Sequence, residues 1–302
     1  MYVGTCYYGI WKTTNQGASW TKVSTGTLGA DLALGRNWTL AVDPTNANVV
    51  YTVAGYGTGQ QGLYKSTNGG VDWAQTLPQS VTSATTGDIY SISIDPADHN
   101  HLLLGSHSPW NFGADAGVLE SKDAGASWIQ HAPIGGTGHG HYVFFISSTT
   151  WLLGTQDAGF WRTTNSGTSW TKVSNENLQH GGGQLYRTAS GVLYTGALNS
   201  ILRSTDQGVT WLRVGPTTPD GFNGIVGDGT TLYAQRANTG TATTGMQSYY
   251  IARESDGVTW TVQNNGAQTF SDGPMNMVYD ANNRIIYSSN WRAGVWKLNV
   301  TP

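Results

Sequence analysis

A string of the form Ser/Thr-x-Asp/Asn-x-Gly-x-x-Trp recurs along this chain and limits its fold more than any other feature. Five complete copies end at Trp20, Trp73, Trp128, Trp170 and Trp211. A sixth copy, RESDGVTW, has one residue fewer and ends at Trp260. Successive copies lie roughly 40 to 55 residues apart, about the length of one four-stranded propeller blade. Because strand-like runs flank each copy, the string predicts the turn of a repeated β-hairpin.

The residue types of the string suit a tight turn better than catalysis. The hydroxyl and the Asp/Asn side chain can bond backbone N–H groups inside the turn, and the glycine supplies positive φ. Three of the six copies carry an amide instead of an acid, and an amide cannot act as a general base. We therefore expect a structural role for the six residues at this position: Asn15, Asn68, Asp123, Asn165, Asp206 and Asp256.

The string resembles the Asp-box, or bacterial neuraminidase repeat. This repeat is found in sialidases, sortilin-type propellers, family 74 xyloglucan hydrolases and propeller polysaccharide lyases. The resemblance covers almost the whole chain and implies an all-β, seven-bladed β-propeller. It does not select one activity, because one fold hosts many chemistries.

The repeat predicts a single propeller domain over residues 1–302. The expected blades are approximately 1–24, 37–77, 88–131, 141–174, 184–214, 222–263 and 275–300. The first blade lacks an inner strand, and the last lacks an outer strand and its box. Either the closure is unusual, or flanking residues lie outside this chain.

Composition narrows the class of partner. The net charge is −3, so the chain has no basic field to attract nucleic acid or an acidic membrane, and no apolar run is long enough to span a bilayer. The single cysteine, Cys6, excludes an internal disulfide. A polar, tryptophan-rich chain is typical of secreted glycan-handling proteins. We expect an extracellular or periplasmic monomer that acts on a poly- or oligosaccharide, although no signal peptide precedes Tyr2.

In propellers with this repeat, ligands bind at the face opposite the boxes. The loops expected there contain six candidate catalytic residues: His107, His141, His180, Tyr56, Arg236 and Arg292. They also contain ten candidate substrate-binding residues: Tyr7, Tyr8, Arg36, Trp110, Asn111, Asp157, Asn199, Asn223, Asp272 and Trp291.

The favoured interpretation is a polysaccharide lyase that cleaves a uronate-containing glycan by β-elimination. This reaction needs a base, a cation for the carboxylate and an acid at the departing oxygen. The candidates for these roles are, in that order, His141 or His107, Arg236 or Arg292, and Tyr56 or Tyr8. Histidines that titrate near neutral pH favour an enzyme over a pure sugar-binding protein.

Three alternatives remain open. A glycoside hydrolase would use two carboxylates, with Asp31, Asp88, Asp115, Asp157 and Asp272 as candidates. A non-catalytic glycan- or protein-binding propeller would use the aromatic residues alone. A divalent metal could be held by His139 and His141, which lie on one side of an extended strand, with His180 or His107. We expect no cofactor, and the glycine-flanked histidines fit a polar loop better than a metal site.

Overall fold

The computed structural model describes residues 1–78, 88–107, 117–131, 140–180, 183–218, 221–237, 249–263, 274–290 and 293–300. These residues form 26 β-strands and one short helix, α1 (Gly29–Leu32). In the described part of the chain, no helix has the length and hydrophobicity needed to cross a membrane.

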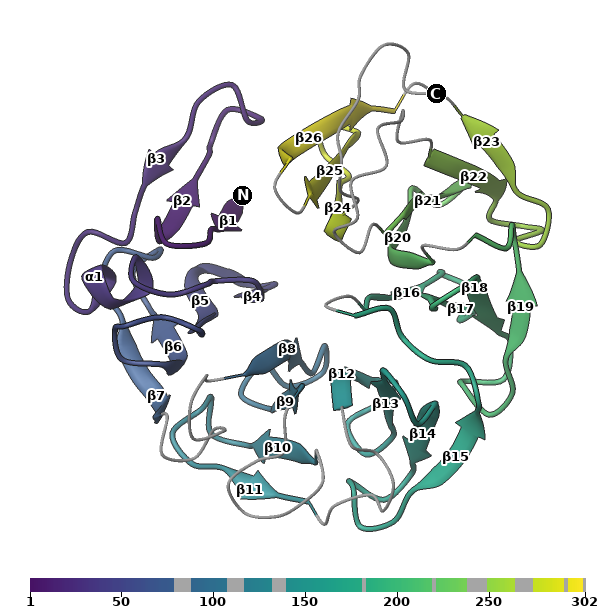
Figure 1. Ribbon diagram of the computed structural model, residues 1–302, viewed down its shortest axis with the longest axis horizontal. Coiled ribbons are helices and arrows are strands. Elements are labelled where there is room, and N and C mark those ends of the chain that lie inside the picture. The colour runs from purple at the N-terminus through teal and green to yellow at the C-terminus, as the bar shows by residue number, and fades with distance from the viewer. Residues whose placement is uncertain are drawn as a thin grey trace. The chain divides into compact units, whose positions relative to one another are not determined.

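The strands form seven antiparallel sheets in which consecutive strands pair (Figure 1). Five sheets have four strands, and the first and last have three. Each sheet is one blade, so the prediction of an all-β, seven-bladed propeller with incomplete terminal blades is confirmed.

The chain divides into two compact units, Met1–Ala158 with Arg162–Thr171, and Gly159–Trp161 with Lys172–Pro302. The prediction of a single domain over residues 1–302 stays a prediction. The first three blades lie in the first unit. Their strands are β1 (Tyr2–Gly4), β2 (Ile10–Lys12), β3 (Thr21–Lys22), β4 (Leu40–Asp43), β5 (Asn46–Ala54), β6 (Gly62–Ser66), β7 (Ala74–Pro78), β8 (Ile89–Ile94), β9 (Leu102–Ser106), β10 (Val118–Ser121) and β11 (Ile129–Gln130).

The fourth blade begins in the first unit, and the last three blades lie in the second. The fourth comprises β12 (Gly140–Phe145), β13 (Trp151–Thr155), β14 (Phe160–Thr163) and β15 (Thr171–Ser174). The last three comprise β16 (Leu185–Arg187), β17 (Leu193–Gly196), β18 (Ile201–Ser204), β19 (Leu212–Val214), β20 (Phe222–Gly227), β21 (Thr231–Arg236), β22 (Tyr249–Arg253), β23 (Thr261–Gln263), β24 (Pro274–Asp280), β25 (Ile285–Asn290) and β26 (Gly294–Asn299).

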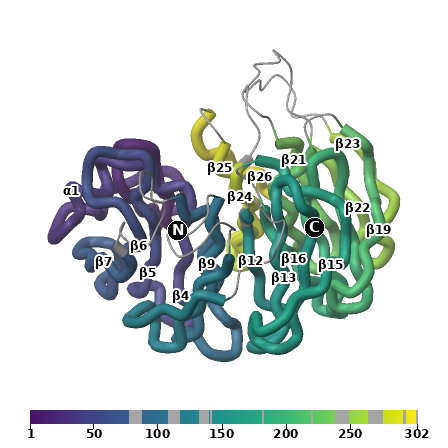
Figure 2. Tube along the Cα trace, turned by 60° about the horizontal axis from the view of Figure 1, so that its bottom comes forward, coloured from purple at the N-terminus to yellow at the C-terminus, as the bar shows by residue number. Residues whose placement is uncertain are grey.

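The core lies between neighbouring blades. In the first unit, Val53 and Leu63 of the second blade pack against Ile89 and Leu104 of the third, and all four side chains are buried. These two blades therefore stack face to face, and the tube view shows β5 and β6 of the second blade side by side (Figure 2). This stacking explains why β9, β13 and β17 read as short, continuous apolar runs rather than as alternating strands.

The repeated string forms the turn between the third and fourth strands of a blade. In the fifth blade, Ser204 Oγ donates to Asp206 Oδ1 (2.7 Å) and accepts from the N–H of Gly208 (2.9 Å). Asp206 Oδ1 also accepts from the N–H of Thr210 (2.9 Å), and Trp211 Nε1 donates to the Gly208 carbonyl (3.2 Å). Gly208 has φ of 82°, which favours glycine. We call these structures the box turns.

The sixth box turn shows how the shorter copy still closes. Glu254 lies where the other copies have a serine or threonine, and the backbone carbonyl of the preceding residue, Arg253, accepts the N–H of Gly257 (2.7 Å). Asp256 Oδ2 accepts from the N–H of Thr259 (2.9 Å). A backbone acceptor thus replaces the missing hydroxyl.

Candidate functional site

The candidate site lies at the strand ends opposite the box turns, in the first unit. In an antiparallel blade, the start of the first strand and the end of the second strand lie at the same end. Arg36 precedes β4 and Tyr56 follows β5, whereas Asp88 precedes β8 and His107 follows β9. Tyr7, between β1 and β2, joins them from the first blade.

Backbone pairing holds three of these loops together. Arg36 forms isolated β-bridges with Cys6 on one side and Gly55 on the other. The Arg36 N–H donates to the Gly55 carbonyl (2.7 Å), and the Tyr7 N–H donates to the Gly35 carbonyl (2.9 Å). The loops of the first two blades therefore place their side chains on one shared surface.

Aromatic rings form a continuous row across this surface. The ring centroids of Trp38 and Tyr56 are 4.9 Å apart, those of Trp38 and Tyr90 are 5.0 Å apart, and those of Tyr90 and His107 are 5.0 Å apart. We call Tyr7, Tyr56, Trp38, Tyr90 and His107 the aromatic row. Trp38 Nε1 donates to the Ile89 carbonyl (2.8 Å), which fixes the indole against the third blade. Tyr90 is only 6% exposed, so the partly exposed rings of Trp38 and Tyr56 are the ones that offer flat apolar faces on which sugar rings can stack.

Arg36 lies among the rings at one end of the row. Its guanidinium carbon is 5.9 Å from the Tyr7 ring centroid, 5.9 Å from that of Trp38 and 5.3 Å from that of Tyr56. Its Nε donates to Tyr7 Oη (3.1 Å), and Tyr7 Oη donates to the Tyr56 carbonyl (3.1 Å). The hydrogen bond to Tyr7 is the largest cause of a raised pKa of Arg36. The cation is therefore held in place by rings and by one hydroxyl.

Both tyrosines beside Arg36 have left-handed backbones, with φ of 68° at Tyr7 and 52° at Tyr56. This conformation is unfavourable for bulky residues and costs on the order of 1 kcal/mol each. Strained residues of this kind cluster at functional sites, where the surrounding structure holds them. Tyr8 follows Tyr7 and is 69% exposed, so it adds a further accessible ring at this end.

An ion pair between His107 and Asp88 occupies the other end of the row. His107 Nδ1 lies 2.9 Å from Asp88 Oδ2, and Asp88 is fully buried. Burial by itself lowers the pKa of His107, but the hydrogen bond and charge of Asp88 outweigh it, and Gln156 and Asp157 act in the same direction. The pKa of His107 is therefore raised, and the ring keeps its proton further toward neutral pH.

The candidate carboxylates differ in what they can reach. Asp88 is committed to His107, and Asp31 is partly buried and accepts from the Gln60 N–H (3.3 Å). Asp157 follows β13, is exposed and lies close enough to His107 to influence its charge. The site thus combines an imidazole of raised pKa with a solvent-accessible carboxylate, the two kinds of group that acid–base chemistry needs.

Several candidates lie elsewhere. In the second unit, His180 is exposed, and the backbone carbonyl of Asn199 accepts from the Thr218 N–H (3.1 Å). Asn223 is buried within β20. Arg236 lies at the end of β21, where it pairs with Phe222 of β20. Seven named candidates lie outside the described residues: Trp110, Asn111, Asp115, His139, Asp272, Trp291 and Arg292.

The metal hypothesis gains no support from the described residues. They contain no group of three or more His, Cys, Asp or Glu side chains that could hold a metal ion. His141 lies on β12, but its side chain is outside what the structure describes, as is the whole of His139.

Sequence reasoning missed two residues of the site, namely Trp38 and Tyr90. Trp38 and Tyr90 belong to strand-like apolar runs, where an aromatic residue is the expected core type. Their signal was positional, because each stands at the start of a run that ends in Asp-Pro, WTLAVDP and YSISIDP. Residues at the start of an inner strand lie at the binding end of the blade.

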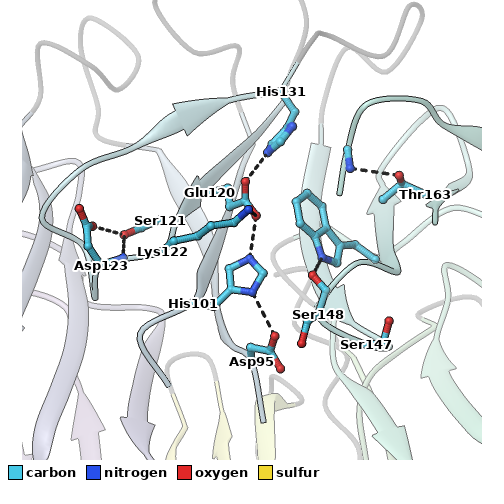
Figure 3. A network of polar contacts seen from close by, with 12 residues as sticks. Asp95, His101, Glu120, Ser121, Lys122, Asp123, His131, Ser147, Ser148 and Thr163 are labelled. Carbon is cyan, nitrogen blue, oxygen red and sulfur yellow. Dashed lines mark hydrogen bonds and ion pairs between the residues drawn. The ribbon is translucent and has the colours of Figure 1, made fainter. Parts of the chain in front are cut away.

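A second polar cluster lies in the third blade at the end that carries the box turn (Figure 3). His101 Nδ1 lies 3.0 Å from Asp95 Oδ2, and its Nε2 lies 2.8 Å from Glu120 Oε1. Glu120 Oε2 lies 3.1 Å from His131 Nε2, and Lys122 Nζ lies 3.4 Å from Glu120 Oε1. We call these five residues the carboxylate–histidine cluster.

The centre of the carboxylate–histidine cluster is buried and packs against the fourth blade, whereas Lys122 is exposed. Asp95, His101 and Glu120 are each at most 5% exposed. The ring centroid of Trp151, from β13, lies 6.0 Å from that of His101 and 5.1 Å from that of His131. Both ring nitrogens of His101 lie within hydrogen-bond distance of a carboxylate, one from Asp95 and one from Glu120. The arrangement is an internal ion network rather than an open site.

The chain is similar to known proteins in fold, but its sequence identity to them is low. No family model matches the chain. A xyloglucanase from Hypocrea jecorina (strain QM6a) is 28% identical over 236 residues, which cover 72% of this chain and 24% of that relative. A GH74 xyloglucanase structure from Xanthomonas campestris matches with a TM-score of 0.70 and 17% identity, over 99% of this chain and 50% of that one. The structure of YCF48 bound to D1 peptide matches with a TM-score of 0.58 and 14% identity, over 88% of this chain and 80% of that one.

These likenesses confirm the broad group of propellers that the repeat indicated. The chain spans 24% of the Hypocrea relative and 22% of a second curated xyloglucanase, from Acetivibrio thermocellus. Xyloglucanases among the relatives favour the glycoside-hydrolase alternative and give no support to β-elimination.

Proposed function

We propose that this chain is the glycan-binding propeller of a secreted glycoside hydrolase, and that a polysaccharide backbone such as that of xyloglucan lies along the aromatic row. The aromatic row, which ends at the His107–Asp88 pair, is the observation that carries this proposal. The curated relatives support it because they are named xyloglucanases. Polysaccharides such as xyloglucan are found outside the cell, which agrees with a secreted protein.

The chemistry assigns different tasks to the two ends of the row. Hydrolysis of a glycosidic bond needs a proton for the departing oxygen and a carboxylate that activates water or attacks the sugar. His107 supplies the proton, because Asp88 holds its Nδ1–H and favours the charged ring. Asp157 supplies the carboxylate, since it is exposed and lies near His107. Tyr56 and Trp38 hold the sugar rings by stacking.

The test measures binding and cleavage together. The protein is incubated with xyloglucan and with a panel of other neutral and acidic polysaccharides, and new reducing ends are measured alongside the ultraviolet absorbance of unsaturated uronate. We expect reducing ends without that absorbance. Asp157→Asn should lower the rate of cleavage at least a hundredfold while glycan affinity stays within a few-fold of the parent.

Two surface variants separate stacking from general effects on the protein. Tyr8→Ala removes a ring that is 69% exposed beside the row and should weaken glycan binding several-fold. Leu212→Ala removes an exposed apolar side chain from β19 and should leave binding unchanged. Affinity without any new reducing ends would refute hydrolysis by this chain. Reducing ends that rise with the absorbance would instead establish elimination.

A further inference from the structure

Arg36 has no ionic partner among the described residues. No carboxylate of that part of the chain lies within 4.0 Å of its guanidinium, and its one side-chain hydrogen bond there is from Nε to Tyr7 Oη. The terminal nitrogens of the guanidinium therefore remain available on a partly exposed side chain. A planar guanidinium with two parallel donors matches a carboxylate better than any other common group.

The surroundings of Arg36 prepare it for a ligand rather than for a partner within the fold. Rings of Tyr7, Trp38 and Tyr56 surround the guanidinium, which keeps it weakly hydrated and limits its rotamers. Tyr7 and Tyr56 keep left-handed backbones, and those backbones bring the two rings beside the cation. The conformational entropy of the guanidinium is thus already reduced before a ligand binds, so less is lost on binding.

We propose that Arg36, with Tyr7 and Tyr56, forms a subsite for a sugar that carries a carboxylate, such as a uronic acid residue. This inference rests on the proposed function, because it names the substituent that the aromatic row would select. The guanidinium fork binds the carboxylate through its two terminal nitrogens, and Trp38 stacks on the same sugar ring or its neighbour. Arg36 lies at the opposite end of the row from His107, so it positions the glycan and takes no part in bond cleavage.

The charge around the subsite favours one carboxylate over a densely charged polyanion. The whole chain has a net charge of −3. Asp88 and Asp157 add negative charge at the far end of the row, near His107. A ligand with closely spaced anionic groups would be repelled there, whereas an isolated uronate at Arg36 would not.

The experiment compares two ligands that differ only in the carboxylate. An oligosaccharide that carries a single uronic acid residue and its carboxyl-reduced form are titrated into the full chain by calorimetry at low and at physiological salt, with neutral xyloglucan oligosaccharides as a third ligand. We expect the parent protein to bind the acidic form about tenfold more tightly, or about 1.4 kcal/mol, than the reduced form. The preference should shrink as salt rises.

Variants locate the preference. Arg36→Gln should remove it, and Arg36→Lys should keep only a small part because an ammonium lacks the planar fork. Tyr7→Phe keeps the ring but loses the hydroxyl that holds Nε, and should reduce the preference to a few-fold. Arg253→Gln, which removes an exposed arginine from β22, is the matched control and should retain the parent preference.

The outcomes separate this inference from the proposed function. Equal affinity of the parent protein for the acidic and reduced forms would overturn the carboxylate subsite and leave glycan binding intact. A preference that survives in Arg36→Gln would place the anion elsewhere and would also overturn it. Failure of the parent protein to bind any of the three glycans would overturn both proposals.

Discussion

Replacement of Glu120 by glutamine should destabilise the protein strongly, although the two side chains have nearly the same shape. Glu120 is 2% exposed and accepts from His101 and His131 while Lys122 lies nearby. Burial by itself raises the pKa of Glu120, but the hydrogen bonds from His131 and His101 outweigh it and lower the pKa from 4.5 to about 2. A difference of that size corresponds to about 3 kcal/mol of stability at neutral pH.

The assay is urea unfolding of the parent protein and of Glu120→Gln, followed by tryptophan fluorescence. Trp151 packs against His101 and His131 and is one of 13 tryptophans whose combined emission reports unfolding. The variant should lose about 3 kcal/mol at pH 7. A carboxyl whose folded pKa is depressed stabilises the protein above its unfolded pKa and loses that contribution as pH falls. The gap between the two proteins should therefore narrow between pH 4.5 and about 2.

A second glutamate provides the control. Glu176 makes a bidentate ion pair with Arg213, but the arginine is 53% exposed and the pair meets solvent. Exposed pairs contribute about 0–1 kcal/mol, so Glu176→Gln should have a small effect. A loss below about 1 kcal/mol for Glu120→Gln, or a gap that stays constant down to pH 2, would refute the assignment of Glu120 as the centre of the cluster.

Three further predictions concern the turns, the blade contacts and the candidate site. Asp206→Ala should lower the free energy of unfolding by about 1 kcal/mol, measured by urea titration, because Asp206 accepts several hydrogen bonds inside its box turn; an unchanged midpoint would contradict this. Gly196→Ala should lower the melting temperature by several degrees, because the added Cβ would meet the Phe222 carbonyl, and a melting curve identical to the parent's would argue against that close approach. Asp88→Asn should lower the pKa of His107, followed by NMR titration of the ring. Since the folded pKa of His107 is raised, its contribution to stability is present at acidic pH and lost as pH rises above 6.5, and Asp88→Asn should abolish that loss.

The repeat predicted the fold because its physics is local. A hydroxyl, an amide or acid, a glycine and a tryptophan at fixed spacing close one kind of turn, and six such turns set the blade spacing without any knowledge of long-range contacts. The same reasoning placed His107 and Asp88 at one end of the blades. It could not pair them, because the contact joins residues 19 positions apart through two different loops.

The carboxylate–histidine cluster marks the limit of that reasoning. His101 directly follows a turn and directly precedes β9. Its two carboxylate partners come from the end of β8 and from β10, and nothing local in the sequence fixes which way the three side chains point. Glu120 stands immediately before its box turn, and the preceding strand carries it into the space between two blades.

The box turns also explain which letters can be exchanged between copies of the repeat. In the first and fourth blades the amide donates to a serine hydroxyl, from Asn15 to Ser19 and from Asn165 to Ser169. In the fifth blade the direction is reversed, and the hydroxyl of Thr210 donates to Asp206. A hydroxyl can rotate to donate or to accept a hydrogen bond. The turn is therefore compatible with either Asn or Asp at this position.

In the second blade this hydroxyl is absent, because Asp72 stands in place of the serine or threonine. There Asn68 Nδ2 donates to Asp72 Oδ2 (2.8 Å), and a carboxylate cannot rotate into a donor. An acid at position 68 would face the carboxylate of Asp72. Among the five complete copies, this is the only one in which the neighbouring residue requires an amide. Whether Asn and Asp can replace one another in a box turn thus depends on whether the residue four positions later carries a hydroxyl, whose proton can rotate.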